Sequence, residues 1–102
     1  MFGPKERGFW TQFGGRDCRK DYKHLVVGSS YRVAKSFKDF DGDSITAGDT
    51  WVYLGVSFFP YEAGISLFVS FDNEQEWVIR LQDYPESQGE IVDYLSDYFC
   101  EF

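Results

Sequence analysis

Carboxylates dominate the chemistry that the last part of this chain offers. Five acids follow one another at intervals of four, three, four and four residues, a spacing that would place them along one stripe of a helix: Glu86, Glu90, Asp93, Asp97 and Glu101. No basic residue lies among them. Like charges at this spacing destabilise a helix by about 0.2–0.5 kcal/mol per pair. The pattern therefore predicts either a solvated face that keeps the protein soluble or a surface that binds a basic partner.

The charges of the chain are divided between its two ends. Nine basic and three acidic residues precede Asp39, whereas one basic and fourteen acidic residues lie from Asp39 onward, which gives a net charge of −7. Such polarity steers encounters with charged partners without setting the fold. We therefore expect a non-enzymatic interaction protein whose acidic surface binds a basic protein partner. Such a protein could be an inhibitor or an immunity protein that blocks a toxin. The residues expected to bind are Glu86, Glu90, Asp93, Tyr94 and Asp97.

Arg80 is the single basic residue of the acidic part. Because a guanidinium suits bidentate pairing with a carboxylate, the sequence predicts an ion pair of Arg80 with Glu76, with Glu62 or with an acid of the C-terminal helix. The alternative function is a small-ligand-binding or enzymatic barrel that uses Tyr61, Glu62 and Arg80. A pocket that contains all three side chains would favour it.

The first 23 residues differ in composition from the rest and are expected to form a basic, aromatic arm, followed by a single globular domain over residues 24–102. Cations and rings alternate irregularly in the arm: Lys5, Arg7, Phe9, Trp10, Phe13, Arg16, Arg19, Lys20 and Lys23. Single-stranded nucleic acid uses such mixtures, so a nucleic-acid-binding module is a further alternative. The acidic body repels phosphate, and we therefore expect the arm to dock on its own domain instead.

The arrangement of potential metal ligands favours structural roles. Asp39, Asp41 and Asp43 lack the EF-hand spacing, because Gly42 comes fourth rather than sixth from the first aspartate, and they predict a hairpin turn. A structural zinc site needs four Cys or His ligands, and His24, Cys18 and Cys100 are one short. We expect no cofactor, no metal and no catalytic residues, and we expect both cysteines to be thiols.

No stretch of the chain is apolar over the roughly 20 residues that span a bilayer, and the first residues carry charges without the apolar run of a signal peptide. We expect a cytoplasmic protein that does not contact a membrane. Aromatic residues make up 21% of the sequence, so a chain of this length can still form a dense core.

Periodicity predicts the elements that position these residues. Strands are expected over residues 31–38, around Ile45, and over 51–59, 65–71 and 76–81. In the last of these, Trp77, Ile79 and Leu81 should face one side of the sheet and the residues between them the other. The run 51–59 is apolar at nearly every position, which is typical of a strand covered on both faces. Ser87 and Glu90 fit a capping box that would begin an amphipathic helix reaching Phe99. The fold class is α+β, a small, strongly bent antiparallel sheet or SH3-like barrel of about five strands with one C-terminal helix.

Two motifs in this order resemble a known family. The first runs from Ser57 to Val69 and contains aromatic-Pro-Tyr-Glu-Ala-Gly, and the second is Ile-Arg-Leu-Gln at residues 79–82. Together with Phe-Asp-Gly at 40–42, Trp51 and Pro-Glu-Ser-Gln at 85–88, they resemble bacterial proteins of domain-of-unknown-function family 3601 over roughly residues 24–99. The resemblance implies a small bacterial domain and brings no activity or catalytic residue.

Overall fold

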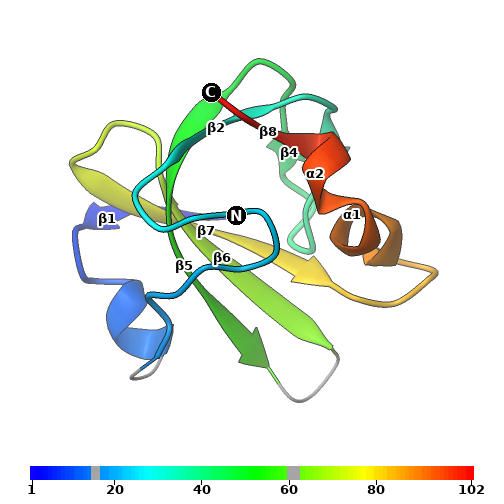
Figure 1. Cartoon of the computed structure of the whole chain (residues 1–102). Helices are drawn as coiled ribbons and strands as arrows, with labels where there is room; N and C mark the ends of the chain where they lie inside the picture. Colours follow the sequence, from blue (N-terminus) through cyan, green and yellow to red (C-terminus); the bar gives the residue numbers. More distant parts are fainter. Residues whose placement is uncertain (15–16, 60–62) are drawn as a thin grey trace.

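The computed structural model describes residues 1–14, 17–59 and 63–102. Its main element is a six-stranded antiparallel sheet, accompanied by a two-stranded sheet and two short helices (Figure 1). The strands are β1 (Phe2–Glu6), β2 (Ser30–Val33), β3 (Phe37–Lys38), β4 (Ser44–Ile45), β5 (Thr50–Phe59), β6 (Gly64–Ser70), β7 (Gln75–Gln82) and β8 (Phe99–Glu101). The helices are the 3₁₀ turn η1 (Thr11–Gly14), α1 (Gly89–Asp93) and α2 (Leu95–Tyr98).

The strand order in the large sheet is β1-β7-β6-β5-β2-β8, with every neighbouring pair antiparallel. The two ends of the chain form its two edges, and the sheet is open. The predicted antiparallel sheet is confirmed, but it has more strands than expected and the SH3-like barrel is not confirmed. The edge strands β1 and β8 were not predicted, because β1 is exposed at four of its five residues and so has no alternating apolar pattern.

The long strand β5 is covered on both faces, as its apolar sequence predicts. On one face lies the larger core, which includes Tyr53, Leu67 and Ile79. On the other lies a smaller cluster of Cys18, Leu54, Phe68 and Val78. Each of these side chains has less than a tenth of its surface exposed. The predicted alternation of β7 is confirmed as well, with residues 77, 79 and 81 packed in or against the larger core.

The segment before Leu25 covers the second face of the sheet. The carbonyl of Cys18 accepts a 2.8 Å hydrogen bond from the N–H of Val56, and a Cβ on Gly55 would lie 2.3 Å from that oxygen. Glu76, which is 1% exposed, accepts hydrogen bonds from the N–H groups of Trp10 at 2.9 Å and Thr11 at 3.1 Å. The basic arm is therefore docked through its backbone on the sheet.

The predicted C-terminal helix is wrong in its extent. Two short helices, α1 and α2, meet at Tyr94, whose φ of −116° and ψ of 41° interrupt the helix. Phe99, the first residue of β8, is fully buried and pairs with Val33 of β2. The sheet therefore requires an extended backbone where the apolar periodicity predicts a helix. The predicted capping box is also absent from the described contacts: Ser87 Oγ donates to Gln88 Oε1 at 2.8 Å, and α1 has no side-chain cap.

The predicted strand over residues 31–38 is two strands, β2 in the large sheet and β3 in the small one. The predicted turn after it is confirmed. Asp39 Oδ1 accepts hydrogen bonds from the N–H of Asp41 at 3.1 Å and from that of Asp43 at 3.0 Å, an arrangement in which aspartate closes a turn on its own backbone. The carbonyl of Arg80 accepts the N–H of Phe40 at 2.8 Å, which holds this turn against β7.

Candidate functional site

An open acidic depression lies where β7 passes into α1. It is lined by Asp83, Pro85, Gly89, Glu90, Asp93 and Tyr94 and has a volume of about 260 Å³. Three of its six residues are carboxylates whose side chains are exposed. Two of the expected partner-binding acids, Glu90 and Asp93, thus meet in one concave surface together with the expected anchor Tyr94. Asp83, which the stripe did not include, belongs to the same depression.

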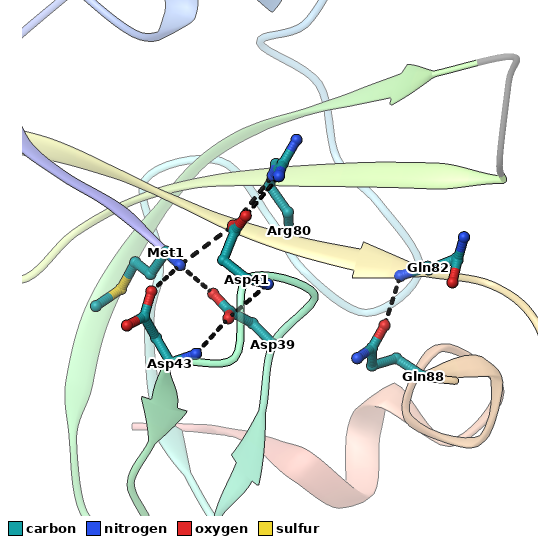
Figure 2. A network of polar contacts seen from close by, with 7 residues as sticks. All are labelled: Met1, Asp39, Asp41, Asp43, Arg80, Gln82 and Gln88. Carbon is teal, nitrogen blue, oxygen red and sulfur yellow. Dashed lines mark hydrogen bonds and ion pairs between the residues drawn. The ribbon is translucent and has the colours of Figure 1, made fainter. Parts of the chain in front are cut away.

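The loop between β7 and α1 is folded back by a pair of hydrogen bonds between two glutamines. The N–H of Gln82 donates to Gln88 Oε1 at 2.9 Å, and the N–H of Gln88 donates to the carbonyl of Gln82 at 3.0 Å; Figure 2 shows the first of these. A Cβ on Gly89 would lie 2.8 Å from the carbonyl oxygen of Tyr84, so glycine permits the close approach that seats α1. These contacts position Glu90 and Asp93 three residues apart on the exposed side of α1.

The five acids predicted to form a stripe on one helix are exposed, but they do not lie on a single helix. Glu86 precedes α1, Asp97 lies in α2 and Glu101 lies in β8. We use the name acidic surface for the exposed residues Asp83, Glu86, Glu90, Asp93 and Asp97. Within residues 1–14, 17–59 and 63–102, no ion pair involves any of these five carboxylates.

One cation, Lys23, contacts the backbone of α1. Lys23 Nζ donates to the carbonyl of Val92 at 2.5 Å, a position at the C-terminal end of α1 where a cation interacts favourably with the helix dipole. Burial, and after it the charges of Asp83 and Asp93, raise the pKa of Tyr22 above its usual value. Tyr22 therefore lies close enough to Asp83 and Asp93 for their charges to act on it.

Tyr94 stands at the break between α1 and α2 and is 58% exposed. The backbone of Tyr94 is not helical, and its ring is not part of the larger core, whereas the adjacent Leu95 is. An exposed tyrosine beside carboxylates can accept a cation on its ring face and offer a hydroxyl at its tip.

A second concavity, which we call the hollow, lies beside the depression. It has a volume of about 120 Å³ and is lined by Phe40, Phe59, Gly64, Ile65, Ser66, Arg80, Leu81 and Gln82. Strand pairing explains its composition, because Gly64 lies opposite Gln82 and Ser66 lies opposite Arg80. Its last residue, Gln82, directly precedes the first residue of the depression.

Arg80 forms one rigid wall of the hollow. Its guanidinium pairs with Asp41 through two hydrogen bonds, one of them 3.0 Å long from Nε, and lies 4.7 Å from the ring centre of Phe2 and 5.2 Å from that of Phe40. The prediction of an ion pair is confirmed in kind, with Asp41 as a partner that was not expected. Glu62, one of the expected partners, lies outside the described residues. The hydrogen bond between the backbones of Phe40 and Arg80 brings the Asp39–Asp43 turn close to Arg80. The two segments are far apart in the sequence, so the sequence pattern does not reveal this contact.

The turn that holds Arg80 also binds the chain's α-amine (Figure 2). Met1 N lies 2.5 Å from Asp39 Oδ2, 2.5 Å from Asp43 Oδ2 and 3.2 Å from Asp41 Oδ2. Partial burial opposes its charge, but hydrogen bonding to Asp39 and Asp43 outweighs that effect and raises the pKa of the Met1 amine. Hydrogen bonds with Arg80, opposed by partial burial, lower the pKa of Asp41.

The remaining expected ligand-binding residues, Tyr61 and Glu62, lie outside the described residues, and of that set the structure places Arg80 alone.

In the arm, Lys5 lies 5.2 Å from the ring centre of Phe9, and Trp10 stacks on Phe2 at 5.5 Å. Much of the aromatic surface that stacked bases would need is thus used within the molecule. His24 Nε2 makes a 2.6 Å hydrogen bond with the carbonyl of Phe99, a structural role at the start of β8.

Comparisons with known proteins identify the family. A family model described as a domain of unknown function, DUF3601, matches residues 16–102. The chain belongs to this family. The match confirms the family suggested by the sequence motifs and begins earlier in the chain than those motifs do. Because the family's description gives no activity, the function has to be inferred from the geometry above.

A solved structure shares the fold. It is an integron cassette protein from the mobile metagenome of Vibrio cholerae, 37% identical, with a TM-score of 0.79, and the alignment covers 86% of this chain and 100% of that one. Like the family match, it supports a bacterial origin. No curated protein matches the chain. Among the described residues, no helix has the length and apolar character needed to cross a membrane.

Proposed function

We propose that this protein is a non-enzymatic interaction protein that binds a basic protein partner through the acidic surface. The observation that carries the proposal is the convergence of Asp83, Glu90 and Asp93 on one open depression, with no ion pair to any of the three among the described residues. Gathered like charges repel one another, and a partner that brings cations relieves this repulsion.

The geometry of the depression supports recognition in addition to steering. Lysine and arginine side chains of a partner can pair with the carboxylates while their apolar stems lie against Pro85 and the ring of Tyr94. Tyrosine is enriched among the residues that dominate binding energy at interfaces. Complementary charge accelerates association and excludes acidic competitors.

The form of the function that we propose is inhibition of a protein with a basic working surface. A row of exposed carboxylates presents charges of the same sign as a phosphate backbone, so it can occupy a surface that binds nucleic acid. An immunity protein that blocks a toxin would act in this way. No catalytic group is required of this chain for such a role.

The test is capture of a partner from an extract of the native host, with the protein immobilised, at about 0.05 M and about 1 M salt. The Debye length, over which salt screens exposed charges, is roughly 3 Å at 1 M salt and more than about 10 Å below 0.1 M, so attraction between exposed charges is much weaker at high salt. We therefore expect a protein with a basic surface to be retained at low salt and released at high salt.

A pair of charge-reversal variants makes this test specific. Glu90→Lys with Asp93→Lys should abolish retention, whereas Glu6→Lys with Glu74→Lys should preserve it. Both variants change the net charge equally, and both control positions are exposed. Glu6 and Glu74 lie near the start of β7, at the opposite end of the strand from Asp83. Equal loss in the two variants, or retention in both, would contradict the proposal.

A further inference from the structure

The hollow and the acidic surface adjoin at the end of β7. Gln82 lines the hollow and the next residue, Asp83, lines the depression. The two hydrogen bonds between Gln82 and Gln88 hold the loop that bears Glu86 against the end of β7. A segment that enters the hollow and continues past Gln82 would therefore reach Asp83 and the carboxylates that follow it.

The rim of the hollow is apolar and exposed. Phe40 is 41% exposed and Phe59 is 66% exposed, so two large rings of the hollow remain in contact with water. Burial of apolar surface is the main favourable contribution to association. Arg80 packs against Phe40 at 5.2 Å and is held by Asp41, which keeps this wall in place before any ligand arrives.

The size of the hollow sets the size of its occupant. Its volume of about 120 Å³ is of the order of the ~150 Å³ engineered cavity that binds benzene. This volume matches one aromatic ring or a comparable aliphatic side chain. Ser66 and Gln82 add polar groups to its lining, which can hydrogen-bond to the backbone of a segment that carries such a side chain.

We infer that the hollow receives one apolar side chain, preferably an aromatic ring, from a partner segment whose neighbouring residues are basic. This inference rests on the proposed function and specifies its partner. The ring supplies a buried anchor that slows dissociation, and the flanking cations meet the acidic surface. Carboxylates beside the hollow repel an acidic segment that carries the same anchor, so the region selects for charge and for shape together.

The experiment uses three synthetic peptides with the whole chain: acetyl-Lys-Lys-Phe-Lys-Lys-amide, the same peptide with Ala in place of Phe, and acetyl-Glu-Glu-Phe-Glu-Glu-amide. Dissociation constants and amide chemical shifts are measured by NMR titration. We expect the basic Phe peptide to bind about tenfold more tightly than the Ala peptide, the increment of one well-buried apolar anchor. It should shift the amides of Gly64 and Ser66, and the acidic peptide should not bind.

Two variants test the position of the anchor. Phe59→Ser should reduce binding of the Phe peptide to the level of the Ala peptide and leave the Ala peptide unaffected. Phe102→Ser is the matched control, because Phe102 is 75% exposed and lines a different concavity; it should change neither affinity. Both positions are exposed, so both variants are expected to fold.

The outcomes separate this inference from the proposed function. Equal binding of the Phe and Ala peptides, with shifts confined to Glu90 and Asp93, would overturn the anchor and leave the acidic surface as the binding site. Binding of the acidic peptide as tightly as the basic one would overturn the requirement for flanking cations. Failure of both basic peptides to bind at low salt would refute the two proposals together.

Discussion

Replacing Glu76 tests how the basic arm is held on the acidic domain. The Glu76 side chain is 1% exposed, and its oxygens accept the N–H of Trp10 at 2.9 Å, the N–H of Thr11 at 3.1 Å and the Thr11 hydroxyl at 3.2 Å. Arg7 Nε lies 3.8 Å away. Glu76→Ala would leave two backbone donors without these acceptors at the start of η1.

The expected loss follows from these contacts. Each hydrogen bond to a charged group contributes about 1.5–3 kcal/mol, and an unsatisfied buried donor costs about 1–3 kcal/mol. Removing the carboxylate also removes the penalty of burying it, so we expect a net loss of about 3 kcal/mol in the free energy of unfolding. For a domain of this size that corresponds to a fall of about 12–24 °C in Tm. Glu76→Gln keeps an acceptor oxygen and should lose only about 1 kcal/mol.

Urea denaturation followed by circular dichroism measures both variants, and Glu74→Ala provides the control. Glu74 is exposed and lies two residues away, so its replacement should change stability by less than about 0.5 kcal/mol. Faster proteolytic cleavage within the first 20 residues of Glu76→Ala would locate the loss in the arm. If Glu76→Ala were no less stable than Glu74→Ala, the docking of the arm by this carboxylate would be refuted.

Three further predictions use the same measurements of unfolding. Gly55→Ala should lose about 1–3 kcal/mol, because its Cβ would lie 2.3 Å from the carbonyl oxygen of Cys18; an unchanged denaturation midpoint would contradict the close approach. Arg80→Met should lose about 1–2 kcal/mol through its contacts with Phe2, Phe40 and Asp41, and a neutral result would contradict the structural role of the ion pair. The pKa of Asp41 is lowered from 3.8, so its stabilising effect is present above that pH and is lost as the pH falls through its lower folded pKa; the stabilities of wild type and Asp41→Asn should converge there, and parallel curves would contradict the linkage.

The central strands could be predicted from the sequence because their apolar pattern is local. Residues 51–59 are apolar at nearly every position and form β5, and the alternation in residues 76–81 correctly separates the two faces of β7. The turn at Asp39–Asp43 follows from residue types that close turns on their own backbone. In each case the signal lies within a few consecutive residues.

The edges and the site could not be predicted in the same way, because they depend on contacts between distant segments. Phe99 has the helical spacing of its neighbours, yet pairing with Val33 makes its backbone extended. Asp41 was not recognised as a partner of Arg80, since 39 residues separate the two. Pairing of β1 with β7 likewise depends on the register of the two strands and on the contact of Met1 with the Asp39–Asp43 turn. Neither can be read from the periodicity of the sequence.

The aromatic residues help to explain why the acidic surface makes no ion pair among the described residues, in a chain that also carries ten bases. Within the described residues, the cations of five side chains lie over aromatic rings: Lys5, Lys20, Lys23, Lys35 and Arg80. Rings attract cations through their quadrupole, so these contacts compete with the carboxylates for the chain's own bases. If the rings were removed, the released lysines would have more freedom to reach the acids and weaken the negative field. The high aromatic content thus stabilises the core and also preserves the charge that a basic partner would meet.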